Sequence, residues 1–397
     1  MRSTAPVVSR PTVHRGSIRL SFASAFGPKI VANVTSGSGL RSFGTGATRH
    51  RHGILGRIPL SQENRMLTSL PILTVTLNPT VDISLEVGRL CDEGKNRVTV
   101  RSVQAGGGGL NVARCVDKLG GAVVALHTFG RETGHRLNRL LEEEGLAHTG
   151  IEIGSDTREA VVVAETDVWH SYHLVPPGAE LSAVERERCL DAITDTAHRF
   201  PYLVLTGSVP PGVPDDFCAR IVHGVDPAVT RVVLDIAGQQ LREVLGERSF
   251  AIRLDRREAA GLLGRPVECF EDAQAANELL LESGATGNAI TTVAALGAVY
   301  SNDASHHRIS APVSVSPRRS DACAGDSLVA AFTSRLAAGT NCLRACEYGV
   351  AAASATVQRP GTEVFDVATV DALVEQVRTY RIDRQARAEP VWAAEGP

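Results

Sequence analysis

Residues 320–332 read Ser-Asp-Ala-Cys-Ala-Gly-Asp-Ser-Leu-Val-Ala-Ala-Phe, and this stretch decides how the rest of the chain is interpreted. Two small residues, Ala324 and Gly325, precede Asp326, and an apolar helical run follows as far as Gly339. A glycine before a helix lets backbone N–H groups approach an anion, and the helix dipole favours negative charge there. A carboxylate at that point can act as a base beside a bound phosphate. The alternative is an aspartate that only caps an ordinary helix.

A second stretch, residues 105–114, reads Ala-Gly-Gly-Gly-Gly-Leu-Asn-Val-Ala-Arg. Its four consecutive glycines lead into a predicted helix and allow the backbone to approach a polar ligand closely. Asn111 adds both a hydrogen-bond donor and an acceptor. A glycine run alone also fits a flexible turn, so the two stretches are interpreted together.

Together the two stretches resemble the signatures of the PfkB-type sugar kinases of the ribokinase superfamily, which are Gly-Gly-x-Gly-x-Asn-x-Ala and Gly-Ala-Gly-Asp. The resemblance continues in order over residues 70–378. Its further segments are 78–82 (Asn-Pro-Thr-Val-Asp), 93–97 (Glu-Gly-Lys-Asn-Arg), 175–179 (Val-Pro-Pro-Gly-Ala), 206–212 (Thr-Gly-Ser-Val-Pro-Pro-Gly) and 349–355 (Gly-Val-Ala-Ala-Ala-Ser-Ala).

Within this family, the glycine run is most similar to the phosphofructokinase branch. The 1-phosphofructokinases and tagatose-6-phosphate kinases usually carry lysine where this chain has Gly108. The resemblance implies ATP-dependent phosphorylation of fructose 6-phosphate at its C1 hydroxyl. Two alternatives stay open: a 1-phosphofructokinase or tagatose-6-phosphate kinase, and a weakly active sugar-phosphate-binding protein on the same fold.

The resemblance also implies a role for individual residues. Asp326 would accept the proton of the sugar hydroxyl, and backbone N–H groups around Cys323, Ala324 and Gly325 would face the transferred phosphoryl oxygens. The expected sugar ligands are Asp82, Gly107, Gly108, Asn111 and Ser208. The expected grip on the sugar phosphate comes from Lys95, Arg97 and Arg158, since arginine makes bidentate contacts with phosphate. For each of these three cations the alternative is a solvated surface charge.

The nucleotide and metal positions depart from the family pattern. The usual Lys-Pro-Asn-x-x-Glu appears at residues 253–258 as Arg-Leu-Asp-Arg-Arg-Glu. We expect ATP and Mg²⁺ as cofactors, with Glu258 toward the metal, because hard cations prefer carboxylate oxygen. The expected nucleotide contacts are Arg253, Asp255, Thr292 and Gly297. The sequence of residues 253–258 fits a solvent-exposed helix start as well as it fits a nucleotide and metal site.

Two glycine positions of the family carry other residues. Ala294 ends a segment that usually reads Ser/Thr-Leu-Gly, and Cys323 replaces the first glycine of Gly-Ala-Gly-Asp. A residue with a Cβ resists positive φ, so a left-handed backbone at Cys323 would strain the anion site.

Short β-rich runs alternate with helical periods from residue 71 onward. This pattern indicates an α/β fold: a doubly wound, mostly parallel sheet with helices on both faces, as in the ribokinases, and a small β-sheet lid. The predicted lid segments are 82–104 and 158–175. Predicted buried strands are 73–77, 123–127, 202–206, 232–235 and 290–293, and predicted helices are 111–119, 182–198, 214–224, 272–284, 326–338, 342–357 and 369–380.

Charge divides the chain into two parts. Residues 1–65 hold ten basic residues and one acidic residue, whereas the remainder holds 31 basic and 43 acidic residues. We expect residues 1–65 to be a disordered basic leader, either transit-like or an upstream start before Met66. The kinase domain is then 66–380, followed by a loose tail at 381–397. A basic arm that binds an acidic partner is a third possibility.

Composition limits the remaining classes. The acidic kinase region argues against nucleic-acid binding, and no apolar stretch is long enough to span a membrane. Eight scattered cysteines without a Cys-x-x-Cys pair indicate reduced thiols and a cytoplasmic protein, or an organellar one if the leader is a transit peptide. The expected partners are sugar phosphate, ATP and a second copy of the chain, which would pair through the lid sheet.

Overall fold

The larger of two β-sheets runs through the whole described region. The computed structural model describes residues 69–168, 170–313 and 321–383, all within the unit formed by residues 59–397. The expected basic leader, and residues 384–397 of the expected tail, lie outside the described residues. In spatial order the strands are β14 (Arg378–Ile382), β13 (Ser305–Ser310), β12 (Ala298–Asn302), β11 (Asn288–Thr292), β10 (Ala251–Leu254), β9 (Arg231–Asp235), β8 (Tyr202–Thr206), β1 (Ile72–Thr76), β4 (Val123–Phe129) and β5 (His148–Glu152).

Strands β11 to β5 of this order are parallel, while β12, β13 and β14 continue the sheet antiparallel. Successive residues of β1 point to opposite faces, as the two-residue period of a strand requires. Ile72 joins one hydrophobic cluster and Leu73 joins the other, and both side chains are fully buried. Both faces of the sheet are therefore covered, which explains why its strands are continuous apolar runs.

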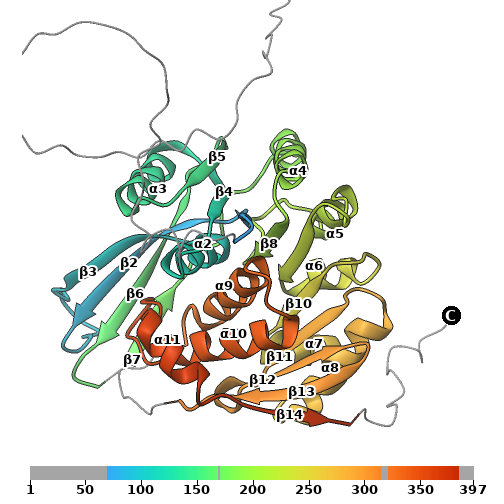
Figure 1. The fold of residues 1–397 in the computed structure, drawn as a ribbon. Helices are drawn as coiled ribbons and strands as arrows, with labels where there is room; N and C mark the ends of the chain where they lie inside the picture. Colours follow the sequence, from blue (N-terminus) through green and yellow to red (C-terminus); the bar gives the residue numbers. More distant parts are fainter. Residues whose placement is uncertain (1–68, 169, 314–320, 384–397) are drawn as a thin grey trace, which may run out of the picture. The chain divides into compact units, whose positions relative to one another are not determined.

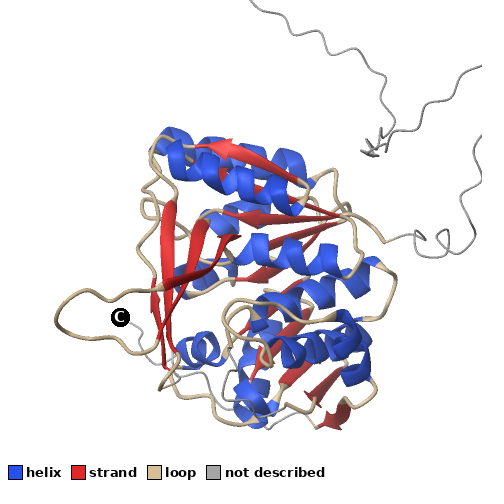
Figure 2. Cartoon of the chain, turned by 90° about the vertical axis from the view of Figure 1, so that its left-hand side faces the viewer, coloured by secondary structure: helices blue, strands red, loops and turns tan. Residues whose placement is uncertain are grey.

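Helices cover both faces (Figures 1 and 2). The cluster that contains Ile72 is completed by α2 (Gly108–Lys118), α3 (Arg131–Glu144), α9 (Ala324–Ala337), α10 (Cys342–Thr356) and α11 (Val367–Val374). The cluster that contains Leu73 is completed by α4 (Ala183–Ala197), α5 (Phe217–Gly224), α6 (Gly238–Val244), α7 (Arg256–Leu263) and α8 (Phe270–Glu282).

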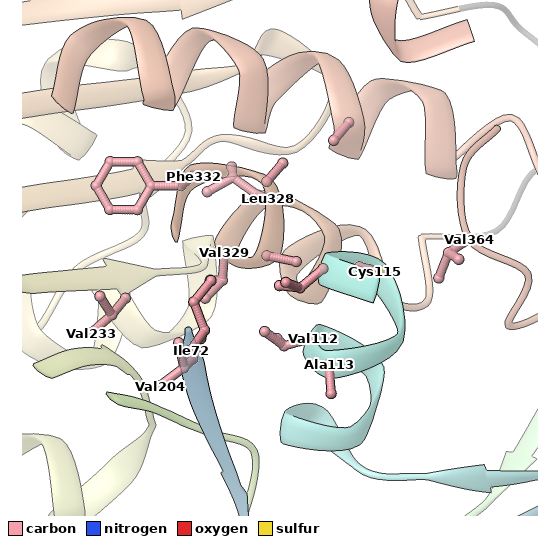
Figure 3. Packing of buried hydrophobic residues seen from close by; sticks show 14 of the residues in the cluster. Ile72, Val112, Ala113, Cys115, Val204, Val233, Leu328, Val329, Phe332 and Val364 are labelled. Atoms are coloured by element: carbon pink, nitrogen blue, oxygen red, sulfur yellow. The ribbon is translucent and has the colours of Figure 1, made fainter. Parts of the chain in front are cut away.

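The packing of α2 on α9 matters most for the site. Figure 3 shows Val112, Ala113 and Cys115 of α2 close to Leu328 and Val329 of α9, above the strands of the sheet. These side chains are almost completely buried. This contact joins two helices that are far apart in sequence and places their N-terminal ends together.

A smaller sheet forms the predicted lid. Its order is β3 (Thr99–Gly106), β2 (Thr80–Val87), β6 (Arg158–Glu165) and β7 (His170–Leu174), and it stands beside the larger sheet in Figure 1. Residues 89–98 are a loop between β2 and β3, not part of a strand. The side chain of Glu165 holds the base of this loop, since its carboxylate accepts the Leu90 N–H at 2.6 Å.

Most predicted elements are confirmed, including β8 at 202–206. The helix predicted over 111–119 is also present, but it starts earlier, at Gly108 within the glycine run, and ends at Lys118. The helix predicted over 369–380 is wrong at its C-terminal end. The helix α11 ends at Val374, and Arg378–Ile382 instead pairs with β13 as an edge strand. Within the described ranges, no helix has both the length and the apolar character needed to cross a lipid bilayer.

Candidate active site

The start of α9 carries the residues that the sequence singled out. Cys323 is the N-cap, Ala324 and Gly325 follow, and Asp326 occupies the first turn. No side chain caps this helix start, and the Ala324 N–H donates to the Asp321 carbonyl at 3.2 Å. The backbone N–H groups of Gly325 and Asp326 remain available to an anion. A Cβ at Gly325 would lie 2.7 Å from Nη1 of Arg253, so a side chain there would require the guanidinium to shift.

Asn111 in the first turn of α2 meets Asp326. The Nδ2 group of Asn111 donates a hydrogen bond to Oδ2 of Asp326 at 2.9 Å, and it lies 3.6 Å from Sγ of Cys323. The two signature stretches thus meet across 215 positions of sequence. The glycine run makes this approach possible, because Gly107 adopts φ 115° as the N-cap of α2. Gly107 also packs against the end of β1, where a Cβ would lie 2.6 Å from Cγ2 of Thr76.

The carboxylate of Asp326 is buried, and burial is the main reason that the pKa of Asp326 rises to about 7. The neighbouring Asp235 carboxylate raises this pKa further, whereas Asn111, Arg253 and Arg114 lower it. A carboxyl group with a pKa close to neutrality is matched to accepting a proton from a sugar hydroxyl.

An ion pair on the other side of Asp326 was not anticipated from the sequence. Nη1 of Arg253 contacts Oδ1 of Asp235 at 3.0 Å, and Nη2 donates to Oγ1 of Thr292 at 2.9 Å. The second carboxylate oxygen of Asp235 accepts a hydrogen bond from the Thr206 hydroxyl at 3.0 Å. Asp235 ends the buried parallel strand β9, and this position at the carboxyl end of a strand is the signal that could have identified it.

Asp82 lies on the lid side of the site, on β2. Its carboxylate packs against Gly106, where a Cβ would come within 2.0 Å of Oδ2. Burial raises the pKa of Asp82 to about 6, and the nearby positive charges of Arg114 and Arg158 oppose that rise. Asp82 is therefore held close to cations at the junction of the lid and the larger sheet.

Arg158 and Ser208 are also placed at this junction. The guanidinium of Arg158 donates to the Asn78 carbonyl at 2.9 Å and to the Pro176 carbonyl at 3.0 Å. The Asn78 side chain donates to the hydroxyl of Ser208 at 3.0 Å. Asn78 thus links two predicted sugar-binding residues, although it was noted in the sequence only as part of a motif.

The structure does not bring all predicted cations together. Lys95 and Arg97 are exposed on the loop between β2 and β3. Among the described residues, neither of their side chains makes a hydrogen bond or an ion pair. Their role in gripping the sugar phosphate stays a prediction.

Gly108, the first residue of α2, lies against the carboxyl end of β8. A Cβ at this position would be 2.8 Å from Oγ1 of Thr206 and 3.0 Å from the backbone nitrogen of Gly207. A lysine at position 108 would therefore require Thr206 or Gly207 to move. The absence of a side chain at this residue is built into the local packing.

A cavity of about 560 Å³ opens beside the start of α9, a volume within the usual range for small-molecule sites. Leu328, Val350 and Val357 supply part of its apolar wall. Its remaining lining includes the predicted nucleotide residues Arg253, Asp255, Thr292 and Gly297, together with Gly325. The four residues predicted to contact the nucleotide are thus gathered around one cavity next to Asp326.

Asp255 and Glu258 form the start of α7. The Asp255 carboxylate caps the helix by accepting the N–H groups of Arg257 and Glu258, and Glu258 accepts the Asp255 N–H at 2.6 Å. Burial, followed by the charge of Asp235, raises the pKa of Glu258 to about 7. The crowding of these carboxylates favours a cation nearby. No group of three or more His, Cys, Asp or Glu in the described part of the chain forms a ready metal cage.

Both positions at which this chain replaces a glycine of the family pattern have a left-handed backbone. Cys323 has φ 59° and Ala294 has φ 46°. Residues with a Cβ pay for this conformation with roughly 1–2 kcal/mol of strain. Cys323 thus has the left-handed backbone that a residue with a Cβ resists, and Ala294, a second strained residue, lies at the rim of the cavity.

This strain predicts an inverted order of stability at position 323. Cys323→Gly is expected to unfold with a free energy about 1 kcal/mol higher than that of Cys323→Ala, because only glycine adopts positive φ without cost. At an ordinary helix position glycine is instead the less stable of the two. Urea unfolding of both variants measures the difference, and an alanine variant as stable as the glycine variant would contradict it.

A doubly wound sheet, a β-sheet lid and a buried carboxylate between them, next to a nucleotide-sized cavity, are the features of a ribokinase-like phosphotransferase. Residues 75–368 match the model of the pfkB family carbohydrate kinases. The chain therefore belongs to the pfkB family of carbohydrate kinases, and both the family resemblance and the expected fold class are confirmed.

Named relatives give the same family. The ATP-dependent 6-phosphofructokinase isozyme 2 of Mycobacterium tuberculosis H37Rv is 32% identical over 305 residues, which is 77% of this chain and 89% of that protein. The 1-phosphofructokinase of Bacillus subtilis is 29% identical over 78% of this chain and all of that protein. The crystal structure of phosphofructokinase-2 from Escherichia coli in complex with potassium has a TM-score of 0.72 and 26% identity, covering 77% of this chain and 98% of that chain.

Proposed function

We propose that this chain transfers the γ-phosphoryl group of ATP to the C1 hydroxyl of fructose 6-phosphate and forms fructose 1,6-bisphosphate. The observation that carries this proposal is the position of Asp326, which is buried between the cavity at α9 and the sugar-side residues on the lid. Relatives named as 6-phosphofructokinases support the choice of fructose 6-phosphate.

Each part of the site has a chemical role in this proposal. Asp326 takes the proton of the C1 hydroxyl, and Asn111 holds the carboxylate in place through its amide N–H. The free backbone N–H groups at the start of α9 face the transferred phosphoryl oxygens. Arg253, held by Asp235, adds a fixed positive charge beside Gly325. Asp82, Gly107, Gly108 and Ser208 bind the sugar, and Arg158 binds its phosphate together with Lys95 and Arg97.

The family uses ATP with a divalent metal ion, and we propose that this metal is Mg²⁺. The donors fit a magnesium–nucleotide complex better than a protein cage, because Mg²⁺ usually takes one or two carboxylates, phosphate oxygens and water. Glu258 is the protein ligand that we assign, with Asp255 at its side. When bound, Mg²⁺ supplies charge neutralisation to the β- and γ-phosphates.

Substrate choice is the direct test of the proposed reaction. We expect kcat/KM for fructose 6-phosphate to exceed that for fructose 1-phosphate at least about tenfold, or ~1.4 kcal/mol in transition-state binding. An assay coupled to ADP release measures both sugars and tagatose 6-phosphate. Preference for fructose 1-phosphate would instead make the chain a 1-phosphofructokinase, as the Bacillus subtilis relative is named. No turnover of any of the three would favour the weakly active binding protein.

We further propose that two copies of the chain pair through the lid. Register places Val100 of β3 and Tyr172 of β7 in one row across the sheet, with Leu174 on the same face. Val100 and Leu174 are 59% and 58% exposed, and Tyr172 is 42% exposed. Asp82 belongs to the opposite face by the same register. The Escherichia coli relative has a tetrameric inhibited form, which is an assembly of that protein.

The lid proposal predicts the mass in solution. Leu174→Asp is expected to convert the protein into a monomer, because burying an unpaired carboxylate in an apolar interface is unfavourable. Sedimentation equilibrium compares it with wild type and with Val184→Asp, a control at a 75% exposed residue on α4. An unchanged mass for Leu174→Asp would remove the lid from the interface.

We also propose that the protein is located in the cytoplasm. It is supported by eight cysteines that are all free thiols, a state typical of reducing compartments.

A further inference from the structure

Arg114 on α2 lies one helical turn after Asn111 and makes an unusually complete set of contacts. Its Nη1 donates to Oδ1 of Asn111 at 3.1 Å, and its Nη2 donates to the Ala105 carbonyl at 2.6 Å. The Glu144 carboxylate at the end of α3 holds the same guanidinium through Nε at 2.9 Å and Nη2 at 3.1 Å. Side chains of both partners are largely shielded, at 22% and 28% exposed.

These contacts determine which way the Asn111 amide faces. A guanidinium can only donate hydrogen bonds, so the group that it meets on Asn111 must be the carbonyl oxygen. The NH₂ end of the same amide then points to the other side, where it meets Asp326. A flipped amide would present an oxygen to the Asp326 carboxylate, which is an unfavourable contact for an ionised base.

We infer that Arg114, anchored by Glu144, is a positioning residue for phosphoryl transfer, which fixes the Asn111 amide so that its N–H faces Asp326. This inference rests on the proposed function, since it assigns Asp326 the role of base. Arg114 itself does not bond Asp326. It acts through its hydrogen bond to Asn111, and its positive charge adds a longer-range effect on the Asp326 carboxylate. Glu144 acts on Arg114 and not on Asn111: its carboxylate accepts two hydrogen bonds from the planar Arg114 guanidinium and so fixes the orientation of that group.

The charge of Arg114 supports the same role. The charged and polar groups that face Asp326 are Asp235 on β9, Arg253 on β10, and Asn111 and Arg114 on α2. The thiols of Cys115 on α2 and of Cys323 at the start of α9 also face it, and burial raises the pKa of both thiols, which keeps them neutral. Arg253 is already paired with Asp235, so Arg114 is the cation on the lid side of the base. Its loss would raise the pKa of Asp326, and the pKa of Asp82 would rise for the same reason.

The test uses Arg114→Met in the full-length protein. We expect kcat with fructose 6-phosphate and ATP to fall at least about tenfold at pH 7, and the acidic limb of its pH profile to move up by about one unit. KM for ATP should change little, because Arg114 does not line the nucleotide cavity. The exposed pair of Arg359 and Glu363 offers a matched control, and Arg359→Met should leave both quantities unchanged.

A double-mutant cycle with Asn111→Ala identifies the route of the effect. The cycle is measured well above the acidic limb, where Asp326 is ionised with or without the charge of Arg114. If Arg114 acts through Asn111, adding Arg114→Met to Asn111→Ala lowers kcat little further at that pH. Independent, multiplying losses would overturn the inference, and so would a folded Arg114→Met protein with a wild-type pH profile. Glu144→Gln, which keeps the guanidinium, provides a milder variant if Arg114→Met does not fold, and it should shift the limb in the same direction.

A readout without turnover separates this inference from the proposed function. The carboxyl ¹³C resonance of Asp326, assigned by its absence in Asp326→Asn, can be titrated in wild type and in Arg114→Met. An upward shift that becomes smaller when Asn111 is already alanine supports the inference, even in a protein that does not phosphorylate fructose 6-phosphate. An unshifted titration contradicts it, whatever the substrate proves to be.

Discussion

Asp326→Asn is expected to lower kcat by a factor on the order of 10²–10⁴, the usual effect of removing a general base. Asparagine has nearly the same shape, so the hydrogen bond from Asn111 and the start of α9 should be little disturbed. It cannot accept the proton of the sugar hydroxyl. Binding of the sugar phosphate, measured by calorimetry, should stay close to that of wild type.

The pH dependence gives this prediction a second measurement. The base must be ionised to act, and the pKa of Asp326 is raised to about 7. Wild-type kcat is therefore expected to be full above pH 7 and to decline as the pH falls below that value. Asp117→Asn, at an exposed residue of α2, is the control and should keep both the rate and the profile. Near-normal turnover in Asp326→Asn would remove Asp326 from the role of base.

Arg253→Met should have the largest effect on stability. Arg253 and Asp235 form a buried ion pair, with side chains 12% and 8% exposed. Removing one partner leaves a buried, uncompensated carboxylate, which typically costs about 3–5 kcal/mol of the free energy of unfolding. The loss should be larger in this site than an average pair suggests, because Asp326 is also negative and close to Asp235.

Urea unfolding of Arg253→Met against wild type measures this cost. Arg220→Met is the matched control: Arg220 makes a shorter contact with Glu187, at 2.8 Å, but with both side chains exposed, at 37% and 57%. Exposed pairs contribute little to stability, so the control should unfold almost like wild type. If both variants lost the same free energy of unfolding, burial of the Arg253–Asp235 pair would add nothing to its contribution to stability.

Much of the fold was predictable because its signals are local. The run Tyr-Leu-Val-Leu-Thr at 202–206 is apolar on both faces, and such a run fits only a strand covered on both sides. The two signature stretches were predictable as helix starts for the same reason. Their meeting through Asn111 and Asp326 came from family resemblance, because no local pattern encodes a contact across 215 positions.

The parts that the sequence missed depend on distant partners. The strand β14 forms because its backbone pairs with β13. Its sequence, Arg-Thr-Tyr-Arg-Ile, is also compatible with a continuation of the preceding helix. Asp235 ends a correctly predicted strand, but its role appears only when Arg253 is seen against it. Arg114 is the last residue of the stretch 105–114, and nothing in the sequence places Glu144 beside it.

The order in which the chain is made has a consequence for the contact between α2 and α9. Helix α2 is complete at Lys118, yet the helix that covers Val112, Cys115 and Val116 begins only at Ala324. During synthesis on a ribosome, roughly two hundred residues must therefore emerge while this apolar face is open. The same interval separates the nascent sugar-binding half from its base. A chain interrupted before residue 324 would expose the apolar face of α2 and would lack the base Asp326. Such a chain would be bound by chaperones or degraded by proteases and would have no kinase activity.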